Sequence, residues 1–167
     1  GASYLGLGVA QIRDLKFAEA CESLGKAVEL NPYDAQAHLF LGRARLALNE
    51  TDKAIQAFQE AQTLQPKLAE VHTALGQAYE AKQQYASALK EYTDAAKLEP
   101  KNATLWMNVA QLADKLGAHD KAADAYVQAF KVGGGEVSAR VQLSELYLKK
   151  NELDQAQSVL TEAIKHF

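Results

Sequence analysis

The stretch AEVHTALGQAYEAKQQYASALKEYTDAAKLEPKN, residues 69–102, is one copy of a repeated unit. Its proline, Pro100, lies 34 residues after Pro66, which lies 34 residues after Pro32, and the chain contains only 3 prolines. A fixed spacing of this kind indicates stacked copies of one supersecondary unit. The spacing predicts five repeats, at about residues 1–34, 35–68, 69–102, 103–136 and 137–167.

Small and large side chains recur at fixed positions when each repeat is numbered from 1 to 34. Positions 20 and 27 hold alanine in all five repeats, at Ala20, Ala54, Ala88, Ala122 and Ala156, and at Ala27, Ala61, Ala95, Ala129 and Ala163. Position 24 is always large and apolar, as Leu24, Phe58, Tyr92, Tyr126 and Leu160. Offsets of four, three and seven residues share one helix face, so the second half of each repeat is predicted to be a packed helix.

The first half of each repeat pairs a large residue with a small one. Positions 7 and 8 read Leu7-Gly8, Leu41-Gly42, Leu75-Gly76, Val109-Ala110 and Leu143-Ser144. Glycine inside a helix costs about 1 kcal/mol relative to alanine, so its recurrence predicts a close contact with a neighbouring helix. Each repeat therefore reads as two helices, helix A near positions 2–14 and helix B near positions 18–31.

Turn and capping residues mark the predicted joints between these helices. Asn49, Gly117 and Asn151 lie between helix A and helix B, and Asp34 and Asn102 precede the next helix A. Side chains of this type accept hydrogen bonds from the free N–H groups of a helix N-terminus. No segment alternates with a period of two for long enough to predict a strand.

The chain resembles the tetratricopeptide repeat (TPR) family over essentially its whole length. The third repeat carries the pattern as Leu75-Gly76, Tyr79, Ala88, Tyr92, Ala95 and Pro100, and the fourth supplies Trp106. The resemblance implies an all-α fold, a right-handed α-solenoid (superhelix) of five helix-turn-helix pairs, forming a single domain over residues 1–167. The fourth repeat departs from the pattern at Ala110 and at Gly133-Gly134-Gly135. Those glycines predict either a looser joint or a helix stop with a left-handed turn, the reading we prefer.

Composition and motifs favour no catalytic, cofactor or metal site. The net charge is −3, which argues against nucleic acid as a partner. No apolar run has the ~20 residues that a membrane helix needs, so we expect a soluble chain without membrane insertion and assign no compartment. Cys21 is the only cysteine and reads as a buried side chain. His38 and His72 share position 4 with Tyr4, Trp106 and Arg140, and packing explains them better than metal binding.

The TPR resemblance also implies a concave groove lined by helix A at positions near 2, 5, 6, 9, 12 and 13. Its predicted lining in the first two repeats is apolar with two arginines: Leu5, Val9, Ile12, Arg13, Leu39, Phe40, Arg43 and Leu46. The predicted lining of the later repeats is mostly polar: Glu70, Thr73, Gln77, Glu80, Thr104, Met107, Asn108, Gln111, Val141, Gln142 and Glu145.

These residues predict a non-enzymatic scaffold or adaptor whose partner is a protein or peptide segment held in the groove. An equally weighted reading is that the apolar residues of the first repeat pack against an adjoining repeat or a second subunit. Two further alternatives stay open. The end repeats could assemble copies of the chain into a homo-oligomer, or the chain could be the recruiting or regulatory arm of a larger enzyme.

Overall fold

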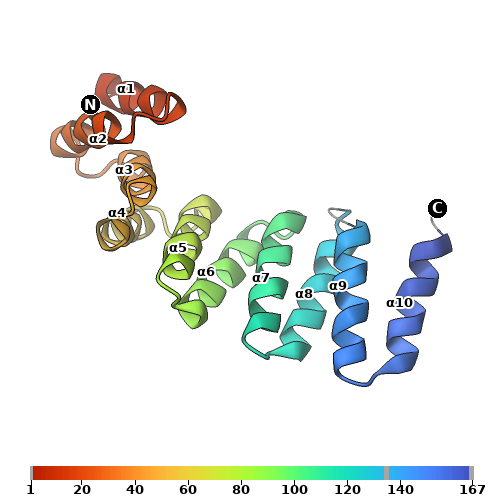
Figure 1. Ribbon diagram of the computed structural model, residues 1–167. Coiled ribbons are helices and arrows are strands. Elements are labelled where there is room, and N and C mark those ends of the chain that lie inside the picture. The colour runs from red at the N-terminus through yellow and green to blue at the C-terminus, as the bar shows by residue number, and fades with distance from the viewer. Residues whose placement is uncertain (1, 134–135, 166–167) are drawn as a thin grey trace. The chain divides into compact units, whose positions relative to one another are not determined.

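The computed structural model describes residues 2–133 and 136–165, without the side chains of residues 2, 136–137 and 162–165, and this part of the chain contains ten α-helices and no strand. The helices are connected in sequence by short turns (Figure 1). Their bounds are α1 Ala2–Arg13, α2 Phe17–Leu30, α3 Ala35–Ala47, α4 Thr51–Leu64, α5 Ala69–Ala81, α6 Tyr85–Leu98, α7 Ala103–Lys115, α8 His119–Lys131, α9 Glu136–Lys149 and α10 Leu153–Lys165. Odd-numbered helices are helix A of each repeat and even-numbered helices are helix B, as predicted, with most bounds shifted by one residue.

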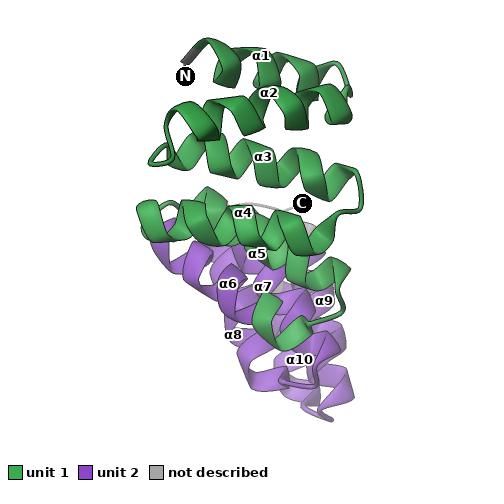
Figure 2. Ribbon diagram, turned by 90° about the vertical axis from the view of Figure 1, so that its left-hand side faces the viewer, with its two compact units in different colours: residues 1–88 green, residues 89–167 purple. Residues whose placement is uncertain are grey.

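The chain divides into two compact units, residues 1–88 and residues 89–167, with the boundary inside α6 (Figure 2). In unit 1 each of the first four helices packs against the helix that follows it, and α3 also contacts α1 and α5. In unit 2 the same sequential packing joins α7, α8, α9 and α10. Each unit is therefore a stack of helix pairs, and the all-α solenoid class is confirmed. The single domain over residues 1–167 stays a prediction.

A left-handed residue separates helix A from helix B in every repeat. Position 15 has positive φ in all five copies: Leu15 (60°), Asn49 (61°), Gln83 (58°), Gly117 (73°) and Asn151 (59°). Asparagine and glycine adopt this conformation readily, which is why the sequence revealed three of the five joints. Leucine and glutamine do not adopt positive φ readily, so the repeat geometry holds Leu15 and Gln83 in a conformation that their side chains disfavour.

The two predicted caps behave differently. The Asp34 carboxylate accepts hydrogen bonds from the backbone N–H groups of Gln36 (3.0 Å) and Ala37 (3.2 Å) and caps α3, as predicted. Asn102 occupies the N-cap position of α7, but its side chain makes no capping hydrogen bond. Its amide instead donates to Glu99 Oε2 at 3.0 Å, so the predicted cap is wrong in its chemistry.

The glycine run after α8 begins with a helix stop. Gly133 has φ of 81°, and its N–H donates to Phe130 O at 3.1 Å. A left-handed glycine directly after the last helical turn is a common way to end a helix. The preferred reading of the run is therefore confirmed at Gly133, while Gly134 and Gly135 lie outside the described residues.

Two helix A glycines lie against the large residue at position 24 of their own repeat. A Cβ atom on Gly8 would lie 2.8 Å from Leu24 Cδ2, and one on Gly42 would lie 2.9 Å from Phe58 Cζ. Real Cβ atoms do not approach so closely, so the two helices can pack at this distance only because the side chain is absent. The predicted reason for these glycines is confirmed. Gly25 has open space around it and needs no such reason.

The core of unit 1 contains one hydrophobic cluster at each of its two junctions between repeats. One cluster combines Ala20 and Leu24 of α2 with Leu41 and Ala44 of α3. A second cluster joins the corresponding residues of α4 and α5, together with Leu39 of α3; it contains Leu39, Ala54, Ile55, Phe58, Ala61, Val71, Ala74, Leu75 and Ala78. Burying one large apolar side chain contributes about 1.5–3 kcal/mol, so these contacts are the main source of the stacking free energy.

Candidate functional site

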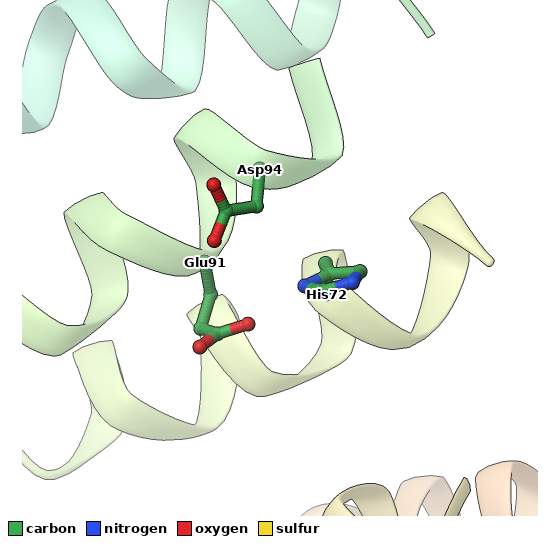
Figure 3. Close-up of side chains that lie close together, drawn as sticks. All are labelled: His72, Glu91 and Asp94. Carbon is green, nitrogen blue, oxygen red and sulfur yellow. The ribbon is translucent and has the colours of Figure 1, made fainter. Parts of the chain in front are cut away.

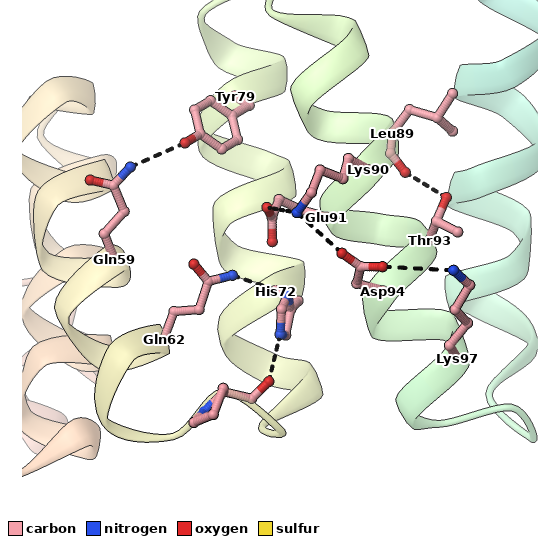
Figure 4. A network of polar contacts seen from close by, with 11 residues as sticks. Gln59, Gln62, His72, Tyr79, Leu89, Lys90, Glu91, Thr93, Asp94 and Lys97 are labelled. Atoms are coloured by element: carbon pink, nitrogen blue, oxygen red, sulfur yellow. Dashed lines mark hydrogen bonds and ion pairs between the residues drawn. The ribbon is translucent and has the colours of Figure 1, made fainter.

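In three repeats the ring at position 4 forms a hydrogen bond that joins helix A to the turn before it. His38 Nε2 lies 2.9 Å from Pro32 O, and Trp106 Nε1 donates to Pro100 O, also at 2.9 Å. His72 Nε2 repeats the contact with Pro66 O at 2.9 Å (Figure 4). A carbonyl oxygen only accepts, so both histidines carry the proton on Nε2. In the second, third and fourth repeats position 4 therefore has a structural role, because its ring N–H donates to the prolyl carbonyl six residues earlier.

The second nitrogen of His72 has a partner as well. Gln62 Nε2 donates to His72 Nδ1 at 3.2 Å, so both ring nitrogens take part in hydrogen bonds within unit 1 (Figure 4). Figure 3 shows His72 on α5 and the carboxylates of Glu91 and Asp94 on α6. In unit 2, Lys90 Nζ lies 3.2 Å from Glu91 Oε1 and 3.3 Å from Asp94 Oδ2. The two hydrogen bonds of His72 fit the packing role expected of position 4.

The helix A face of unit 1 brings most of its predicted lining residues together, because α3 contacts both α1 and α5. Leu5, Val9, Ile12, Phe40 and Leu46 are half-buried, and each therefore keeps some apolar surface exposed. Arg13, Glu70, Gln77 and Glu80 are exposed, while Arg43 and Thr73 are half-buried. We call this set the helix A face of unit 1.

Leu39 does not belong to that face, and its prediction as a groove residue is wrong. The side chain is fully buried, with 0% exposure, and lies in the core cluster with Phe58, Val71 and Leu75. Leu39 packs against Val71 and Leu75 of the next repeat, whereas the TPR resemblance implied that position 5 lines the groove. Its neighbour Phe40 at position 6 stays half-buried.

Arg43 is held in place by two contacts on the helix A face of unit 1. Its guanidinium carbon lies 5.4 Å from the ring centroid of Phe40, and Arg43 Nη2 lies 2.7 Å from Glu70 Oε1 on α5. A guanidinium presents five donors in a planar fork, so one carboxylate oxygen leaves donors free for a second acceptor. The arrangement offers a positioned cation beside exposed apolar surface.

The predicted lining residues of unit 2 are mostly polar and lie at the surface. Thr104 and Gln111 are exposed on α7, and Met107 and Asn108 are half-buried on the same helix. On α9, Val141 and Glu145 are exposed and Gln142 is half-buried. Amide and hydroxyl groups at these positions can donate to and accept from a peptide backbone.

Ion pairs between repeats in unit 2 were not anticipated from the sequence. Lys149 Nζ lies 2.8 Å from Asp114 Oδ2 of the preceding repeat, and within the fourth repeat His119 Nδ1 lies 3.1 Å from Asp114 Oδ1. The hydrogen bond from Lys149 lowers the pKa of Asp114 below its ordinary value. A second bridge places Lys150 Nζ 2.8 Å from Asp120 Oδ1, and Lys150 lowers the pKa of Asp120. The sequence signal for the second bridge was a lysine at position 14 with an aspartate at position 18 of the preceding repeat, whereas the first bridge joins position 13 to position 12.

A surface cavity of about 800 Å³ lies in unit 2 where the α6–α7 turn meets the end of α8. It is lined by residues 99–104, including Pro100, and by Val132 and Gly133. It contains none of the predicted lining residues apart from Thr104.

None of the helices in the described part of the chain is both long and apolar enough to cross a membrane.

Solved structures of several proteins share this arrangement of helices. A structure described as MamA protein has a TM-score of 0.85 and 22% identity, covering 98% of this chain and 90% of that one. TTC0263, a thermophilic TPR protein in Thermus thermophilus, has a TM-score of 0.66 and 26% identity, with 98% and 90% coverage. Pseudomonas aeruginosa pilF has a TM-score of 0.77 and 19% identity, covering 95% of this chain and 72% of that one. The comparison with curated proteins gives no match.

Family profiles agree with the repeat boundaries and the fold. A profile described as Tetratricopeptide repeat matches residues 5–69 and 73–134, and a second profile with the same description matches residues 137–165. Together these matches span all five predicted repeats and most of the chain. The chain therefore belongs to the tetratricopeptide repeat family.

Proposed function

We propose that this chain is a non-enzymatic adaptor that binds a peptide or protein segment on the helix A face of unit 1. Family membership supports the coarser part of this proposal, because tetratricopeptide repeats serve as protein-interaction or assembly modules. The finer part rests on one observation. Arg43 is fixed between Phe40 and Glu70 on a face that also keeps Val9 and Ile12 partly exposed.

The chemistry of this face favours an extended or helical segment with apolar side chains and an acidic group. A ligand that covers the apolar surface which these half-buried side chains still expose gains about 25 cal/mol per Å². The free guanidinium donors of Arg43 suit a carboxylate, and Arg13 adds a second exposed cation on α1. In unit 2, the side-chain amides of Asn108, Gln111 and Gln142 can donate to and accept from the backbone groups of a peptide.

Peptides selected from a random library on the full chain provide the test. The Kd of a selected peptide, measured by fluorescence anisotropy, is expected to rise at least tenfold in Val9→Glu and in Arg43→Glu, because each change removes a contact on this face. Gln56→Glu, on the exposed side of α4, is the control and is expected to leave the Kd unchanged.

The Arg43–Glu70 pair allows folding and binding to be separated. The double variant Arg43→Glu with Glu70→Arg keeps an ion pair between α3 and α5 but moves the cation. Unchanged circular dichroism with weakened binding would support direct recognition by Arg43. Full affinity in the double variant and in Val9→Glu would contradict the proposed face.

A further inference from the structure

The helix A layer changes charge between the second and third repeats. Helix α3 carries Arg43 and Arg45 and no carboxylate, whereas α5 carries Glu70 and Glu80 and no lysine or arginine. The two helices contact each other, and Arg43 Nη2 lies 2.7 Å from Glu70 Oε1. Both repeats are internal to the sequence, with one repeat before them and two after them. A ligand that crosses from α3 to α5 therefore meets a cation first and then a carboxylate.

The stacking of repeats does not require this ion pair. Arg43 is at position 9 of its repeat, and Glu70 is at position 2 of the next repeat. At the other three junctions the same two positions hold only uncharged side chains: Val9 and Gln36, Gln77 and Thr104, and Gln111 and Ser138. Both charged side chains reach solvent, with side-chain exposures of 37% and 43%, and an exposed ion pair contributes little to stability. The pair is therefore a feature of this one surface and not of the repeat fold.

Each partner of the pair keeps hydrogen-bonding capacity for a ligand. A guanidinium has five N–H donors and a carboxylate has two oxygens that accept, so one contact between one nitrogen and one oxygen uses a small part of either group. The ring of Phe40, 5.4 Å from the guanidinium carbon, helps to hold Arg43 in position. The pair therefore offers a ligand a positioned cation with a carboxylate directly beside it.

A ligand with charges of both signs suits this pair better than a ligand with one. A lone carboxylate bound to Arg43 also lies close to Glu70 and is repelled by it, and a lone ammonium bound to Glu70 is repelled by Arg43 in the same way. When the ligand supplies both groups, each of the four charges lies beside a charge of opposite sign. A network of several charges contributes more than an isolated exposed pair.

We propose that the segment bound on the helix A face of unit 1 carries an acidic and a basic side chain next to each other, the acidic one on Arg43 and the basic one on Glu70. This inference rests on the proposed function and adds a basic residue to the ligand. Because the two protein groups are in direct contact, the two ligand side chains are neighbours on one face of the ligand. They are two residues apart in an extended segment, or three or four residues apart in a helical one.

Peptides selected on the full chain from a random library test the inference. Those that bind on this face are expected to be enriched in an acidic and a basic residue at these spacings. Replacing the basic residue of such a peptide by glutamine is expected to raise its Kd about fivefold on the wild-type chain and by less than about twofold on Glu70→Gln, because that variant has already lost the contact. Fluorescence anisotropy at low salt measures the four Kd values, since salt screens exposed charges.

Glu70→Gln gives the sharpest outcome, because its effect is expected to change sign with the peptide. The variant is expected to bind the original peptide more weakly, and the glutamine version of the peptide more tightly, than the wild type does. Glu60→Gln, at an exposed carboxylate on α4, removes the same charge elsewhere and is expected to leave both Kd values unchanged.

Two results would overturn the inference and leave the proposed function standing. One is an effect of Glu70→Gln that has the same sign for both peptides. The other is a set of selected peptides that bind on this face with an acidic residue and no basic one. Full affinity in Val9→Glu and in Arg43→Glu would instead contradict the binding face itself, and the inference with it.

Discussion

The two units stack the same helix pair with different side chains. In unit 1 two helix A glycines, Gly8 and Gly42, admit the large residue at position 24 into direct contact with the helix backbone. In unit 2 position 8 is Ala110 or Ser144, so a side chain occupies the place that glycine leaves open. Ion pairs between consecutive repeats occur in both units, as in Lys82–Asp52 and Lys150–Asp120. The two units therefore differ in the closeness of the contact at position 8, and this difference decides how each unit responds to substitution there.

The largest expected effect lies in unit 1, at Gly42. Gly42→Ala is expected to reduce the free energy of unfolding by about 1–3 kcal/mol, because the new methyl group overlaps the buried ring of Phe58. Urea unfolding followed by circular dichroism measures the loss. Gly25→Ala is the matched control and is expected to stabilise by up to about 1 kcal/mol, since its Cβ meets open space.

A second substitution separates overlap from other effects at this position. Phe58→Leu added to Gly42→Ala makes room for the methyl group, so the double variant is expected to be more stable than the sum of the two single changes predicts. If the losses in unfolding free energy of the two single variants simply add in the double variant, overlap with the ring of Phe58 is not the cause of the destabilisation by Gly42→Ala. Equal stability of Gly42→Ala and the wild type would contradict close packing in unit 1.

The left-handed joints should respond with opposite signs in the two units. Gln83→Gly in unit 1 is expected to stabilise by up to about 1 kcal/mol, because it removes a side chain that disfavours positive φ. Gly117→Ala in unit 2 is expected to destabilise by about the same amount. Thermal unfolding of both variants measures the difference, and changes of the same sign would argue against strain at position 15.

The smallest expected effect concerns the ion pairs of unit 2. Lys149 lowers the pKa of Asp114, so the folded state binds this proton less readily than the unfolded state. The stabilisation is present above the ordinary carboxyl value of 3.8 and is lost as the pH falls through the lower folded-state value. Lys149 is exposed, so the contribution at neutral pH is below about 1 kcal/mol.

Asp114→Asn removes the titrating group from this bridge. Its free energy of unfolding is expected to be slightly lower than that of the wild type at pH 7 and to depend less on pH on the acid side. Urea unfolding midpoints of the wild type and the variant, measured at pH 7 and at an acid pH below 3.8, give the pH dependence of the stability of each protein. Lys149→Gln should reproduce the flatter profile, and an acid dependence unchanged in both variants would show that the bridge does not form in solution.

The repeated part of the molecule could be predicted from the sequence because it depends on periodic packing. The same helix contacts explain three features of the sequence: the alanines at positions 20 and 27, the large residue at position 24 and the glycines at position 8. The joints at Leu15 and Gln83 were missed because those residues do not favour positive φ, and the surrounding repeat holds them there.

The candidate site was predicted less completely, because it depends on which helix face meets the next repeat. Leu39 and Phe40 are adjacent in sequence, yet Leu39 is fully buried and Phe40 keeps exposed surface. The stacking of Arg43 on Phe40 and its pair with Glu70 also join residues from different repeats. Spacing within one repeat carries no information about contacts of this kind.

Methyl NMR of the full chain with a library-selected peptide tests the binding face most directly. Binding on the helix A face of unit 1 is expected to shift the methyl signals of Val9, Ile12 and Leu46 and to leave those of Leu30 and Leu98, on helix B, unchanged. The largest shifts at Leu30 and Leu98, with Val9, Ile12 and Leu46 unaffected, would contradict the account.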